Sequence, residues 1–114
     1  MDRVKIVTLL NQWADGHVNE CIVHEQAEEW LEQLSEQPSY PEENAQSILL
    51  EVLMQLDALN HQLITKEDIP TIRSFLATPP GTEQIGWTRW RKYWENLDLE
   101  RRREELKSNP YYCI

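Results

Sequence analysis

Apolar residues recur every three or four positions along most of this chain, which is the period of an α-helix. The clearest case is the stretch Asn44–Leu59, where one broad arc of a helical wheel is apolar. Leu50 and Met54 lie outside that arc, so we expect this helix to need neighbours on several sides. We predict that it is the central helix of the fold. The apolar arc consists of Ala45, Ile48, Leu49, Val52, Leu53, Leu56 and Leu59.

Five further segments show helical spacing. Val4–Thr8 is β-branched enough to suggest a strand, but its period and the absence of partner strands favour a helix. A chain of 114 residues suits one domain. The sequence therefore predicts an all-α fold, a single compact domain over residues 1–114 with five or six helices around Asn44–Leu59. The other helices are expected at Asp2–Ala14, Glu20–Glu36, around Ile69, Ile72, Phe75 and Leu76, from Thr82 or Gly86 to Asn96, and at Leu99–Lys107.

Short polar signals mark where these helices begin and end. Gly16 is expected to end the first helix, and Asn19 to cap the second. Thr65 and Asp68 have the spacing of a capping box, with aspartate in place of glutamate. Asp98 can cap the last helix.

The net charge of −9 is distributed unevenly along the chain. Residues 1–70 carry 3 basic and 14 acidic side chains, a net charge of −11, whereas residues 71–114 carry 8 basic and 6 acidic ones, a net charge of +2. Binding to phosphate depends on Lys and Arg, so the acidic first half argues against a general nucleic-acid or anionic-membrane role. It permits a basic protein as the partner.

The predicted helix Glu20–Glu36 contains no Lys or Arg and places five glutamates on one side. Like charges four residues apart repel, at about 0.2–0.5 kcal/mol per pair in an isolated helix. The face either serves solubility or docks a basic group. That group could belong to another protein or be the chain's own run of three arginines at 101–103. We predict a partner-binding surface made of Glu25, Glu28, Glu29, Glu32, Glu36 and Asp57.

No nucleotide-binding, serine-hydrolase or zinc-protease motif is present, and the sequence indicates no catalytic residue, metal or cofactor. His24 and Glu28 are one helical turn apart, but two ligands do not make a metal site. Asp57 and His61 have the same spacing and could form a carboxylate–imidazole base. No nucleophile accompanies them, so a local ion pair, or a histidine that caps the last-turn carbonyls of the helix, is the simpler interpretation.

Aromatic and basic residues alternate in one later segment. Such a composition can stack bases and hold phosphates, and it is equally typical of a core stripe with a cationic outer face. The acidity of the whole chain favours the core stripe, and a protein-binding surface is the better functional alternative. The segment contains Trp87, Arg89, Trp90, Arg91, Lys92, Tyr93 and Trp94.

No run of about 18 apolar residues could span a membrane, and the N-terminal residues lack the features of a secretory signal. We therefore expect no membrane partner and a cytoplasmic location. In that compartment Cys21 and Cys113 are expected to remain free thiols.

Several short stretches together resemble a family of short, acidic, uncharacterised bacterial proteins, and the resemblance covers most of the chain. They are Trp13-Ala14-x-Gly16, Val23-His24-x-x-Ala27-Glu28, Asp57-x-Leu59-Asn60, Leu63-Ile64-Thr65-x-Glu67-Asp68-Ile69-Pro70 and Phe75-Leu76-x-Thr78-Pro79-Pro80-Gly81, with the helix start Asp98-Leu99 and a Pro-Tyr tail. The family brings no established activity or functional residues. In size, acidity and helix content its members are similar to immunity proteins, which neutralise a toxin by binding it.

The function expected from these observations is a non-enzymatic protein-binding module, most concretely an immunity-type inhibitor. Its acidic helical face would occupy a basic, phosphate-binding surface of a toxin such as a nuclease, with long-range charge speeding the encounter. One alternative is a small enzyme or ligand-binding protein with a pocket near Asp57 and His61. The other is a nucleic-acid binder that uses the 87–94 segment.

Overall fold

The computed structural model describes residues 3–34 and 45–112, and within these ranges it contains helices and no strand. The all-α prediction is confirmed. The Cα radius of gyration is 14.0 Å, close to the value of about 13 Å expected for a compact chain of this length. No helix in the described part of the chain is both long and apolar enough to cross a bilayer. The elements are α1 (Arg3–Ala14), α2 (Glu20–Leu34), α3 (Ala45–Asp57), α4 (Leu59–Gln62), the 3-10 helix η1 (Lys66–Asp68), α5 (Ile69–Leu76), α6 (Glu83–Glu95) and α7 (Leu99–Leu106).

The described residues form seven α-helices, where the sequence predicted five or six. The difference arises in the predicted helix Asn44–Leu59, which is interrupted at Ala58, where φ is −100° and ψ is 21°. The short α4 follows, and Leu63 ends it with a left-handed backbone conformation, φ 56°. A non-glycine residue rarely adopts this conformation. The spacing of apolar residues therefore did not predict that α4 ends at Leu63.

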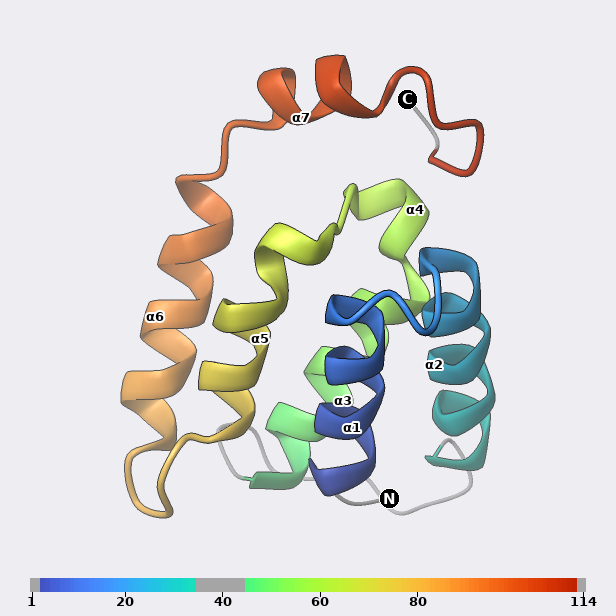
Figure 1. Ribbon diagram of the computed structural model, residues 1–114. Coiled ribbons are helices and arrows are strands. Elements are labelled where there is room, and N and C mark those ends of the chain that lie inside the picture. Colours follow the sequence, from blue (N-terminus) through green and yellow to red (C-terminus); the bar gives the residue numbers. More distant parts are fainter. Residues whose placement is uncertain (1–2, 35–44, 113–114) are drawn as a thin grey trace.

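The helices stand side by side, with α2 at one edge and α6 at the other (Figure 1). The most extensive helix–helix packing is between α2 and α3, while α5 packs against α1, α3 and α6. Figure 1 shows α7 lying across one end of this array, and the chain after α7 turns back toward α2. The C-terminal segment therefore joins elements from both edges of the molecule.

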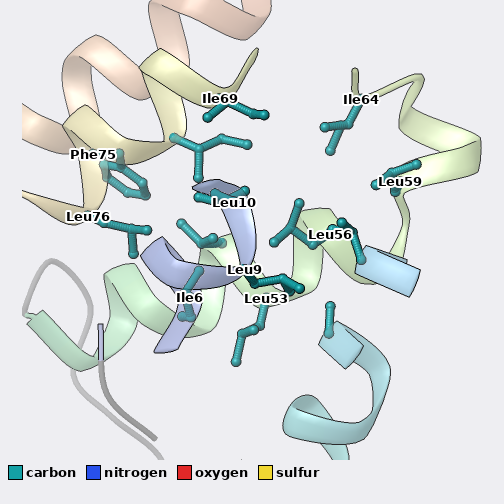
Figure 2. Close-up of a cluster of buried hydrophobic side chains, with 14 of the residues drawn as sticks. Ile6, Leu9, Leu10, Leu53, Leu56, Leu59, Ile64, Ile69, Phe75 and Leu76 are labelled. Carbon is teal, nitrogen blue, oxygen red and sulfur yellow. The ribbon is translucent and has the colours of Figure 1, made fainter. Parts of the chain in front are cut away.

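The predicted apolar faces meet in one core, part of which is shown in Figure 2. Leu53 and Leu56 of α3 are fully buried. Met54, however, is 52% exposed. The expectation that the side of the helix carrying Met54 needs a neighbour was therefore wrong, because a single Met can remain at the surface at little cost. The core also contains Ile6, Leu9, Leu10, Trp13, Val23, Ala27, Ile48, Leu49, Val52, Leu59, Leu63, Ile64, Ile69, Ile72, Phe75, Leu76, Trp90 and Tyr112.

The predicted helix ends are confirmed by their hydrogen bonds. Gly16 has a left-handed φ of 81° just after α1, which glycine adopts without strain. The Asn19 side chain accepts a hydrogen bond from the backbone N–H of Ile22 at 3.0 Å, and Asp98 does the same for Arg101 at 3.0 Å. These caps set where α2 and α7 begin, and so which side chains each helix turns outward.

Candidate functional site: an acidic helix face and two polar clusters

The outer face of α2 carries a row of glutamates. Glu25, Glu28, Glu29 and Glu32 are exposed, whereas Val23 and Ala27 on the opposite side are buried in the core. Glu36, the fifth predicted member, lies outside the described residues. Packing of the apolar face against α3 thus turns the carboxylates toward solvent, where their mutual repulsion is weakened by water.

The basic run near the C-terminus does not neutralise this face through Arg101 or Arg102. Arg101 pairs instead with Glu67 at 3.5 Å and with Glu105, one turn along α7, at 3.5 Å. Arg102 pairs with Asp68 at 2.6 Å and with Glu67 at 3.4 Å. The question left open by the sequence is therefore answered for these two arginines, which contact η1 rather than α2.

Arg102 and Asp68 form a buried ion pair in which the two side chains are 1% and 0% exposed. The guanidinium donates twice to the Asp68 carboxylate, with distances of 2.6 and 2.9 Å from its two terminal nitrogens. It also donates to the backbone carbonyl of Leu63 at 3.0 Å. A bidentate Arg–carboxylate pair fixes both position and angle, so this contact holds α7 onto the turn between α4 and α5.

The remaining partners of Asp68 complete the cluster. Its carboxylate accepts the backbone N–H of Thr65 at 2.9 Å, which confirms the predicted capping box, and the hydroxyl of Tyr93. Burial, followed by the hydrogen bond to Asp68, raises the pKa of Tyr93. Burial lowers the pKa of Arg102, but its bonds to Asp68 outweigh this and the pKa is raised overall. The sequence predicted only the cap, because nothing local links Asp68 to a residue on α7.

A second polar cluster lies where α2 meets the end of α3. His24 Nε2 is 3.8 Å from Asp57 Oδ1, and His24 Nδ1 is hydrogen-bonded to the hydroxyl of Tyr111. The predicted local pair between Asp57 and His61 is wrong. The helix break at Ala58 separates the two residues into α3 and α4, and His61 is exposed.

The aromatic stripe of α6 faces inward. The rings of Trp90 and Phe75 stack with centroids 4.3 Å apart and planes at 13°, and Trp94 meets Trp90 edge-on. Trp90 is buried, and Trp87 packs against the core with Arg91 over its ring at 5.4 Å. Because these aromatic faces contact each other, they favour the core-stripe interpretation over a surface that stacks bases.

A groove of about 540 Å³ runs between α5 and α6, and Arg89 is the charged residue in its described lining. Phe75 and Trp90 supply aromatic surface to it, together with Ile85. The groove is lined by neither Asp57 nor His61, so it does not provide the pocket that the ligand-binding alternative requires.

Comparison of the chain with protein-family models, with curated proteins and with solved structures finds no match. Function therefore has to be inferred from the described surfaces and clusters.

Proposed function

We propose that this chain is a non-enzymatic protein-binding module, most concretely an immunity-type inhibitor that occupies a basic surface of a toxin. The binding surface comprises the acidic face of α2 and the adjacent Asp57. The observation that carries the proposal is the engagement of Arg101 and Arg102 at η1. These two arginines therefore do not neutralise the α2 face, and its exposed carboxylates can attract a basic partner.

The charge of this face supports fast association more than high affinity. Exposed charges in a row produce a long-range field that steers an oppositely charged partner, and this effect weakens as salt is added. A toxin that binds nucleic acid must carry a basic surface for phosphates. An acidic helix that occupies this surface would block it directly.

The proposal includes α3 as the helix around which the others are arranged. It is supported by the complete burial of Val52, Leu53 and Leu56 and by the packing of α3 against α2 and α5. A firmly packed inner face keeps α2 rigid, which lowers the entropy lost when its outer face binds. The resemblance to immunity proteins and a cytoplasmic location are also parts of this proposal.

The test starts from a pull-down with the intact chain in an extract of the source organism, followed by binding kinetics with the captured protein. Glu25→Gln/Glu29→Gln removes two charges from the α2 face. Glu95→Gln/Glu100→Gln removes two exposed charges elsewhere and is the matched control. We expect the first variant to associate at least about threefold more slowly at low salt, with the difference vanishing at high salt.

Inhibition is the functional readout. If the captured protein is a toxin such as a nuclease, one equivalent of the chain should suppress its activity. Equal association rates for the two double variants, or a captured partner with an acidic contact surface, would rule out the α2 face as the binding site.

A further inference from the structure

Three side chains with metal-binding atoms converge between α2 and the end of α3. His24, Glu28 and Asp57 each offer one ligand atom, and these atoms all lie within 4.8 Å of one another. We propose that they form a binding site for one divalent transition-metal ion of the Zn²⁺ class. This inference goes beyond the docking function and requires no partner protein, although Glu28 and Asp57 also belong to the proposed docking surface.

The backbone places these three residues in a defined arrangement. His24 and Glu28 are one turn apart on α2, so their side chains leave the helix on the same side. Asp57 is the last residue of α3, the helix against which α2 packs most extensively. Two packed helices vary little in their relative position, which means that the site is largely formed before any ion binds.

The second nitrogen of His24 supports the assignment. The Tyr111 hydroxyl, reached from the segment after α7, is hydrogen-bonded to His24 Nδ1. When Nδ1–H donates to that oxygen, the lone pair of the ring is at Nε2, the nitrogen that lies 3.8 Å from Asp57. Histidines that bind metals usually have such an outer partner on the other ring nitrogen, which orients the ring. A simple surface ion pair between His24 and Asp57 would not need it.

The spacing and charge of the three groups also suit a dication. Ligand atoms around tetrahedral Zn²⁺, at about 2.0–2.2 Å from the metal, are roughly 3.3–3.6 Å apart. The present separations would have to shorten by about 1.5 Å at most, within the reach of the exposed Glu28 side chain. Two carboxylates balance the charge of the ion, and one imidazole favours a transition metal over Ca²⁺ or Mg²⁺, which prefer oxygen ligands.

Titration calorimetry of the intact chain with ZnCl₂ tests the proposal. We expect one Zn²⁺ per chain, and no comparable binding of Ca²⁺ at the same concentration. His24→Gln, Glu28→Gln and Asp57→Asn should each weaken binding at least tenfold. Tyr111→Phe keeps all three ligands but removes the outer partner of His24, and it should weaken binding by about tenfold.

Two control variants separate this site from other modes of zinc binding. Glu29→Gln removes an exposed carboxylate of the same face that is not in the cluster, and Cys21→Ser removes a nearby thiol. Both should bind Zn²⁺ within about twofold of the unmodified chain. Equal losses in Glu29→Gln and Glu28→Gln would mean diffuse attraction to the acidic face, and loss in Cys21→Ser would mean a thiol site. Either result, or unchanged binding in Asp57→Asn, overturns the proposal. Circular dichroism of each variant verifies that it is folded.

Discussion

Replacing Arg102 with methionine should remove a large part of the stability of this fold. Methionine keeps much of the length and apolar volume of the side chain but lacks the charge and the donors. The carboxylate of Asp68, which is 0% exposed, would lose both bonds from the guanidinium. It would retain the N–H of Thr65 and the hydroxyl of Tyr93. A buried carboxylate without a counter-charge is strongly unfavourable.

The size of the effect follows from this burial. Breaking one side of a buried ion pair typically costs about 3–5 kcal/mol, and the carbonyl of Leu63 loses its donor as well. The free energy of unfolding of a domain of this kind is about 5–15 kcal/mol. The melting temperature should therefore fall by roughly 12–20 °C, at about 4 °C per kcal/mol for a chain of this length.

Urea unfolding followed by circular dichroism measures this loss, and Arg101→Met is the matched control. Arg101 is the neighbouring residue, but its side chain is 57% exposed and its ion pairs are at the surface, so its removal should cost about 0–1 kcal/mol. In a double-mutant cycle, Asp68→Asn and Arg102→Met should show a coupling of roughly 2–3 kcal/mol. If the free energies of unfolding of Arg102→Met and Arg101→Met differ by less than about 1 kcal/mol, the buried pair does not anchor α7.

Three further predictions concern the core, the C-terminal segment and the thiol. In urea unfolding, Leu53→Ala should lower the free energy of unfolding by about 2–5 kcal/mol. Met54→Ala, at a 52% exposed position of the same helix, should lower it by less than about 1 kcal/mol. Equal losses in the two variants would contradict the assignment of Leu53 to the core face. Burial, followed by the charge of Glu20, raises the pKa of Tyr112. The unfolded chain therefore ionises first, so the contribution of Tyr112 to stability is complete below about pH 10 and is lost above it. Tyr112→Phe should flatten this decline above about pH 10 in urea unfolding, and an unchanged slope would refute the assignment. Burial and the Glu25 carboxylate raise the pKa of the free Cys21 thiol. Its alkylation by iodoacetamide should therefore be slow at neutral pH and faster in Glu25→Gln. Identical alkylation rates in the two proteins would mean that Glu25 does not influence the thiol.

Cys113 lies outside the described residues, and Cys21 is a free cysteine. Its sulfur lies 3.6 Å from a carboxylate oxygen of Glu25. This contact explains why Glu25→Gln is the informative variant for thiol reactivity.

Local features of the sequence were sufficient for most of the helices and for several of their ends. An α-helix is held by hydrogen bonds between residues four apart, so its period and its caps are recorded in short stretches of sequence. The helix α1 and the caps at Asn19, Thr65 and Asp98 were predicted for this reason. The break at Ala58 was not predicted, because a change in the backbone angles of one residue does not alter the hydrophobic pattern on either side of it.

The polar partners were decided by the tertiary structure. Arg102 and Asp68 are 34 positions apart, and whether they meet depends on how α7 lies across the end of the helices. The same holds for Asp57, whose predicted partner was one turn away but whose observed partner, His24, is on another helix. Such choices depend on the fit between buried faces, a property of all the packed side chains together rather than of any one segment. The sequence could therefore identify an acidic face on α2, while the packing of α3 and the C-terminal segment determined which side chains stand beside it.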